Sequence, residues 1–207
     1  MTLRTQTFRT RMGQCASLGL LGLAACHDSP STSPQIESLP ESPAAEAALS
    51  LSKPIPPELA VPSEHALAAF RKGVGVQIYT CAAADAAYSW AFKAPQADLL
   101  SADKRAAGSH YAGPTWKALD GSSVVGTKIA SASIRPSAVP ALLLQAASHS
   151  GSGVFSNVSY IHRLNTTGGL APTKACGAAN AGEVVEVAYT ADYFFYNPPS
   201  GSDSRHE

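Results

Sequence analysis

The sequence predicts an all-β fold, a single antiparallel β-sandwich or barrel, and three observations support this. Runs of β-branched and aromatic residues bounded by Gly, Pro or Asp indicate strands at Val74–Cys81, Tyr88–Ala94 and Ser123–Ile134. The Asp120-Gly121 pair between Trp116–Leu119 and Val124–Gly126 is a hairpin signal, because Gly accepts the positive φ of a tight turn. Turn signals at the close spacing of a sandwich or barrel recur along the rest of the domain.

The remaining elements follow from local pattern. Ser63–Lys72 is the only plausible helical stretch, and it is also compatible with a strand. Ala141–Ala147 is a continuous apolar run that fits a buried strand or a short helix, whereas Val154–Leu164 alternates as a strand does. Glu183–Tyr196 predicts one long strand, or two strands joined near Ala191-Asp192.

The N-terminal region predicts export and lipid anchoring. Met1–Ala25 carries Arg4, Arg9 and Arg11 before the apolar run Ala16–Ala25, which is the pattern of a signal peptide and too short to span a bilayer. The run ends in Leu23-Ala24-Ala25-Cys26, a lipobox whose cysteine thiol accepts a diacylglyceryl group. Acyl chains at about 0.8 kcal/mol per buried CH₂ would anchor the protein stably.

Composition divides the chain into four parts. Residues 1–25 form the signal peptide, and residues 26–57 form a Ser-, Pro- and Ala-rich tether that begins at the lipidated Cys26. Residues 58–199 form one β-rich domain, and residues 200–207 form a disordered tail. The chain would lie in the cell envelope, and His27 after the acylated cysteine favours the outer membrane, facing the periplasm or the exterior.

The cysteines predict one disulfide. Cys15 leaves with the signal peptide and Cys26 is acylated, so Cys81 and Cys176 remain to pair in an oxidising compartment. The chain-entropy model assigns a loop of this length roughly 4–5 kcal/mol of stabilisation.

Charge and motifs exclude several functions. The 15 Lys and Arg residues balance 15 Asp and Glu residues, so the chain lacks the basic character of a nucleic-acid-binding protein. The sequence has no Gly-rich dinucleotide fingerprint, no phosphate-binding loop, no nucleophile elbow and no metal-ligand spacing among its six histidines. We therefore expect no cofactor and no metal, and a binding role is favoured over catalysis.

Several segments together resemble a bacterial and fungal family known as domain of unknown function 3455. They cover nearly the whole domain in order, and the resemblance implies no particular activity. The resembling stretches are Gly75–Cys81, Gly108–Trp116, Asp120–Gly126, Tyr160–Pro172 with Cys176, and Tyr189–Tyr196.

The segment Gly108–Trp116 is the first candidate for a binding site. His110, Tyr111 and Trp116 surround a Gly113-Pro114 turn, and Trp116 would serve as a stacking platform for a glycan or another small molecule. The more common arrangement, which we expect, places Trp116 and Tyr111 in the core and has His110 capping the turn.

Arg163 offers a second candidate. It could clamp an anion approached by the amides of Gly168-Gly169, but such an arginine more often pairs with an internal carboxylate, here Asp192 or Glu186. If a ligand site exists, it should involve His110, Trp116 and Arg163, with Tyr111 and Asp192 in support.

The sequence therefore predicts a membrane-anchored lipoprotein whose β module binds a small molecule, a glycan or an envelope protein. The alternative is an enzyme whose site the fold assembles from His110, His162 and Asp192, with or without a metal.

Overall fold

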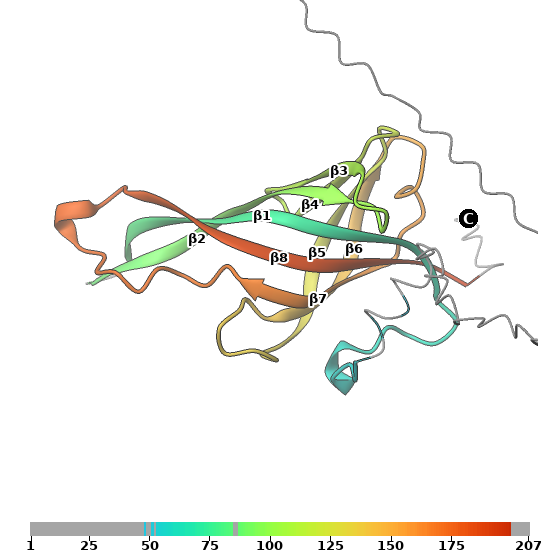
Figure 1. The fold of residues 1–207 in the computed structure, drawn as a ribbon, viewed down its shortest axis with the longest axis horizontal. Coiled ribbons are helices and arrows are strands. Elements are labelled where there is room, and N and C mark those ends of the chain that lie inside the picture. The colour runs from blue at the N-terminus through green and yellow to red at the C-terminus, as the bar shows by residue number, and fades with distance from the viewer. Residues whose placement is uncertain (1–47, 49–50, 52, 85–86, 200–207) are drawn as a thin grey trace, which may run out of the picture. The chain divides into compact units, whose positions relative to one another are not determined.

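The computed structural model describes residues 48, 51, 53–84 and 87–199, which form a closed antiparallel barrel (Figure 1). The predicted signal peptide, Cys26, residues 27–47, 49, 50 and 52 of the predicted tether and the predicted tail at 200–207 lie outside the described residues. Each strand pairs with the next in sequence, and β8 returns to pair with β1. The eight strands are β1 (Ala66–Ala84), β2 (Ala87–Leu100), β3 (Ala106–Tyr111), β4 (Thr115–Ala118), β5 (Ser123–Ala132), β6 (Ala141–Ser150), β7 (Tyr160–Gly168) and β8 (Val184–Asn197).

The prediction of an all-β fold is confirmed, and barrel closure resolves the choice between sandwich and barrel. The helical reading of Ser63–Lys72 is wrong, because β1 begins at Ala66 and pairs with β8 from its first residue. Ala141–Ala147 lies in the strand β6, and Glu183–Tyr196 forms the single strand β8, which starts at Val184.

The predicted strand Val154–Leu164 is only half correct. Residues 154–157 form a turn, and β7 begins at Tyr160. Phe155 and Val158 are both buried at the barrel end, so their apolar character reflects a packed turn rather than strand alternation. The backbone N–H of Val154 donates to Asp120 Oδ2 at 2.8 Å, which ties this turn to the Asp120-Gly121 hairpin.

Two hydrophobic clusters lie on opposite faces of the strands, because successive side chains of a strand point to opposite sides of the sheet. The inner cluster fills the barrel, and β8 contributes Tyr189, Ala191, Tyr193 and Phe195 to it. The outer cluster covers part of the outside surface and includes Phe194 and Tyr196 from the same strand.

An N-terminal segment packs against the outer cluster. It includes Leu51, Ile55 and the 3₁₀ turn η1 (Pro57–Leu59), in which Leu59 is completely buried. His162 Nε2 donates to the carbonyl of Leu59 at 2.6 Å, and Tyr196 OH donates to His162 Nδ1 at 3.1 Å. Part of the range predicted as tether thus contacts the barrel through this segment.

The predicted disulfide is present. Cys81 and Cys176 are joined, with Cα atoms 5.5 Å apart and a sequence separation of 95. The bond links β1 to the loop before β8, at the end of the barrel where β1, β2 and β8 run beyond the other strands (Figure 1). None of the described residues belongs to a helix that is long and apolar enough to cross a bilayer.

Candidate ligand-binding cavity

The barrel contains a cavity of about 350 Å³ that opens where the short β3–β4 hairpin ends. β2 pairs with β3 only from Ala97 onward, and β4 pairs with β5 only up to Val125. Beyond these points β2 and β5 face each other without a strand between them. The cavity is lined by Phe92, Lys93 and Pro95 of β2, His110 of β3, the turn Ala112–Pro114, Trp116 of β4, Lys128 of β5, Leu142 and Leu144 of β6, and Arg163 of β7.

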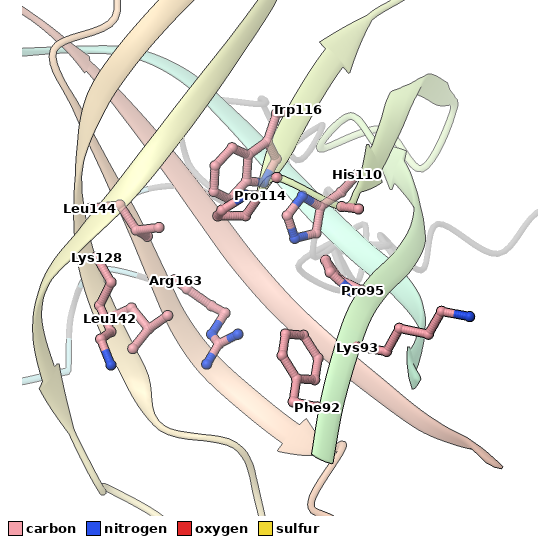
Figure 2. Close-up of a pocket in the computed structure, with 12 residues that line it drawn as sticks. Phe92, Lys93, Pro95, His110, Pro114, Trp116, Lys128, Leu142, Leu144 and Arg163 are labelled. Carbon is pink, nitrogen blue, oxygen red and sulfur yellow. The ribbon is translucent and has the colours of Figure 1, made fainter. Parts of the chain in front are cut away.

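A second lobe of about 300 Å³ adjoins this cavity. The two lobes share Phe92, Lys128, Leu142 and Arg163. The second lobe is further lined by Gln77, Tyr79, Ser131, Val139 and Pro140. The Arg163 side chain therefore borders both lobes, and Figure 2 shows it extending between Leu142 and Phe92.

Irregularities of strand register surround the cavity. The β1–β2 pairing shifts between Ile78 and Tyr79, and the β5–β6 pairing shifts between Lys128 and Ala130. The β7–β8 pairing shifts between Leu164 and Thr167, directly after Arg163. Bulges of this kind bend strands and change the direction of their side chains, and they are common at barrel rims.

Arg163 is a largely buried cation without a carboxylate partner in the described part of the chain. Its Nε and Nη2 both donate to the carbonyl of Pro140, at 3.2 and 2.9 Å. None of the acidic residues in the described part of the chain lines either lobe. Burial lowers the pKa of Arg163, and the nearby tyrosines, Tyr193 first, partly oppose this shift. The guanidinium stays charged, since arginine is too basic to lose its proton near neutral pH.

The predicted ion pair of Arg163 with Asp192 or Glu186 is wrong. Asp192 instead lies 3.7 Å from Lys72 Nζ and accepts a hydrogen bond from Asn165 Nδ2 at 2.9 Å. The reason is strand alternation: Asp192 precedes the inner residue Tyr193 and so points to the outside of the barrel, whereas Arg163 points inward.

His110 contributes a neutral imidazole to the cavity wall. It is 3% exposed, and burial lowers its pKa to about 3, with the charge of Arg163 adding to the shift. Nδ1 lies 2.8 Å from the carbonyl of Thr115, which can only accept a hydrogen bond. The single proton of the neutral ring is therefore on Nδ1, and Nε2 presents a lone pair.

Trp116 is a core residue, as the more common arrangement predicts, rather than an open stacking platform. It is 1% exposed and its indole stacks on the His110 ring. The indole fits because position 126 is Gly: a Cβ there would lie 3.1 Å from Trp116 Cζ3 and 3.2 Å from Leu144 Cβ. Trp116 Nε1 has no hydrogen-bond partner in the described structure, and neither has Gln77 Nε2 of the second lobe.

The other predicted site residues lie elsewhere. Tyr111 is 41% exposed, so its predicted place in the core is wrong. The amide of Gly169 donates to the carbonyl of Ala188 and is not free to approach an anion. His162 belongs to the outside face, where it contacts Leu59 and Tyr196.

The alternative catalytic arrangement is not assembled in the structure. His110 faces the barrel interior, whereas His162 and Asp192 lie on the outside face. Across the described ranges, no three His, Cys, Asp or Glu side chains gather as a metal site would require.

Sequence reasoning missed most of the apolar cavity wall. Phe92, Pro114, Leu142 and Leu144 border the space that His110 and Arg163 enter, as Figure 2 shows for these labelled side chains. Their sequence segments do indicate strands and a turn. The register shifts that direct them to one cavity have no local sequence signal, so this part of the site became visible only in the fold.

The fold and the cavity define a small closed β-barrel with an interior cavity. The chain belongs to a family described as a protein of unknown function (DUF3455), whose profile matches residues 62–197. Comparisons with curated proteins and with solved structures gave no match.

Proposed function

We propose that this protein is an exported, lipid-anchored binding module whose barrel holds a small organic anion with an apolar body. The observation that carries the proposal is the Arg163 guanidinium, which is largely buried in the cavity wall and which, among the described residues, donates hydrogen bonds only to the Pro140 carbonyl. A buried charge without a counterion is costly, and a carboxylate on a ligand would supply one.

The charges around the cavity favour an anion over a cation. Lys128 and Arg163 both line the two lobes, and none of the described acidic side chains does. Lys93 also borders the cavity, but its ammonium group extends away from the space in Figure 2. Arg163 still has donors free, because the guanidinium has five N–H groups and only its Nε and Nη2 donate to Pro140.

The cavity wall favours an apolar body on that anion. Phe92, Pro95, Pro114, Leu142 and Leu144 supply most of its surface. A cavity of about 350 Å³ is within the range of small-molecule sites, and apolar walls with a few placed polar groups are typical of them.

A binding role is also supported by the chemistry of His110. With its pKa near 3, the imidazole neither holds a proton at neutral pH nor readily accepts one, so it is poorly suited to general acid–base catalysis. No carboxylate or second histidine lines the cavity beside it.

Export and anchoring are supported by the sequence. The charged and apolar segments before Cys26 match a lipoprotein signal peptide, and His27 after it favours the outer membrane. The Cys81–Cys176 disulfide is consistent with an oxidising compartment outside the cytoplasm.

Ligand binding is tested on the full mature chain by calorimetry with 3-phenylpropanoate and its neutral analogue 3-phenylpropanamide. The carboxylate should bind at least about tenfold more tightly than the amide. Arg163→Gln should remove that preference, whereas the control Lys93→Gln should keep it. Equal affinity for the acid and the amide, or no binding of either, would contradict the proposal.

Anchoring is tested separately by fractionation of cells that express Cys26→Ser. The variant should leave the membrane fraction or accumulate as an unprocessed precursor. Unchanged processing and membrane retention would refute the lipid anchor without affecting the ligand-binding proposal.

A further inference from the structure

Among the described side chains that line the first lobe of the cavity, the one hydrogen-bond acceptor is His110 Nε2, whereas Trp116, Lys128 and Arg163 carry donors. Nδ1 of the same ring donates to the Thr115 carbonyl at 2.8 Å, and this fixes the tautomer. The described residues offer Nε2 no hydrogen-bond partner, although His110 is only 3% exposed. In Figure 2 the imidazole points into the cavity on the side opposite Arg163.

The ring cannot turn to remove this acceptor from the cavity. It stacks on Trp116 with centroids 4.4 Å and planes 12° apart, and it also contacts Tyr193 at 5.1 Å. A flip of the ring would place a carbon where Nδ1 now donates to Thr115, and would lose that buried hydrogen bond. The position of the Nε2 lone pair is therefore set by the fold.

A ligand whose one polar group is an anion would pair with Arg163 but would offer no donor to His110 Nε2. Its carboxylate would accept hydrogen bonds from Arg163, but its apolar part would cover His110 Nε2 and leave a buried acceptor unpaired. An acceptor that is buried without a donor weakens binding, because its hydrogen bond to water is lost and not replaced. A hydroxyl group on the ligand, distant from its carboxylate, would donate to Nε2 and remove this cost.

The rigid part between these two groups is best supplied by an aromatic ring. The wall between His110 and Arg163 includes Phe92, Pro95 and Pro114, which offer flat or rigid apolar surfaces. Phe92 is 54% exposed although its edge contacts Tyr79 at a centroid distance of 5.7 Å. Aromatic rings favour such edge and offset contacts.

We propose that the cavity selects aromatic carboxylic acids that carry a ring hydroxyl, with the carboxylate on Arg163 and the hydroxyl donating to His110 Nε2. This inference rests on the proposed function and adds the specificity-determining residue. His110 selects the ligand by accepting a hydrogen bond, while Arg163 supplies affinity for the anion.

The test compares four acids on the full mature chain by calorimetry: 3-phenylpropanoate, its 3-hydroxyphenyl and 4-hydroxyphenyl analogues, and the 4-methoxyphenyl analogue. One of the hydroxyphenyl acids should bind at least about tenfold more tightly than the unsubstituted and methoxy acids. His110→Phe keeps a flat ring against Trp116 and removes the acceptor. It should abolish the hydroxyl preference and bind 3-phenylpropanoate more tightly than the unmodified protein does, because no buried acceptor is then left unpaired.

The outcomes separate the two proposals. If all four acids bind equally to the unmodified protein, the specificity proposal is overturned and the anion-binding proposal stands. If none of them binds, both fail. If His110→Phe does not fold, the comparison of hydroxyl with methoxy on the unmodified protein still decides, because a methoxy group cannot donate.

Discussion

The imidazole of His110 lies parallel to the indole of Trp116, with ring centroids 4.4 Å apart and an interplanar angle of 12°. The two residues are directly paired across the β3–β4 hairpin, so their side chains share the inner face of the barrel. Trp116 covers one face of the imidazole, and the ring edge remains for the cavity. A core contact and a candidate ligand contact are thus made by the same pair.

Removal of the Arg163 charge should abolish ligand binding without lowering the stability of the fold. Arg163→Met keeps an unbranched side chain and removes a buried charge that has no carboxylate partner. The free energy of unfolding should stay unchanged or rise by up to about 2 kcal/mol, while binding of 3-phenylpropanoate is lost. Urea denaturation and calorimetry check the two parts. A marked loss of stability would show that Arg163 is needed for the fold.

On acidification, the free energy of unfolding should begin to fall at a pH above the range in which carboxylates titrate. Burial lowers the pKa of His110 from 6.5 to about 3 and also lowers that of His162, so the unfolded chain binds protons first. The stability from these neutral rings is present above the unfolded pKa and is lost as pH falls below it. Between about pH 6.5 and pH 5, His110 alone should cost roughly 2 kcal/mol.

The control for this pH dependence is His110→Gln, which cannot titrate. Denaturant unfolding of both proteins at several pH values should show a smaller acid loss for the variant. Equal losses in the two proteins would contradict the assignment to His110. The depressed pKa values of Asp103, Asp120 and Glu183 act in the same direction, but only at lower pH, because they begin near 4.

Loss of the disulfide should reduce stability strongly. Cys81→Ala with Cys176→Ala opens a loop with a sequence separation of 95. The chain-entropy model predicts a loss of about 4–5 kcal/mol. Urea denaturation of the oxidised protein and the double variant measures the difference. A change below about 1 kcal/mol would show that the bond contributes little to the folded state.

The N-terminal segment should contribute to the stability of the barrel. Leu59 is completely buried in the outer cluster, so Leu59→Ala should lower the free energy of unfolding by about 2–4 kcal/mol. Leu119→Ala is the matched control, because Leu119 is 73% exposed and the change should cost less than about 0.5 kcal/mol. Similar effects of the two substitutions would show that the segment is not packed on the barrel as described.

The fold class could be predicted because its signals are local. The β-branched runs of β1, β2 and β5 and the Asp120-Gly121 turn each specify their own geometry. The prediction failed at residues 154–158, where Phe155 and Val158 are buried from a turn that imitates strand alternation. It also failed to exclude a helix at Ser63–Lys72, because short apolar segments fit both periods.

Of the candidate site, only the part on the β3–β4 hairpin could be predicted from the sequence. His110 and Trp116 are near in sequence and flank one turn, so their proximity follows from the chain itself. The absence of a carboxylate beside Arg163 depends on which face of β8 carries Asp192, and that face is fixed by long-range register. A change of one residue in register reverses the faces of a strand.

The sequence by itself determined most of the strands, the hairpin turn, the pairing of Cys81 with Cys176 and the family, because these depend on local pattern or on few alternatives. Only the tertiary structure decided that the barrel closes, that Arg163 faces inward without a carboxylate, and that His110 offers a lone pair to the same cavity. These features arise where strands far apart in the chain meet in register, and register is set by the packing of the whole barrel.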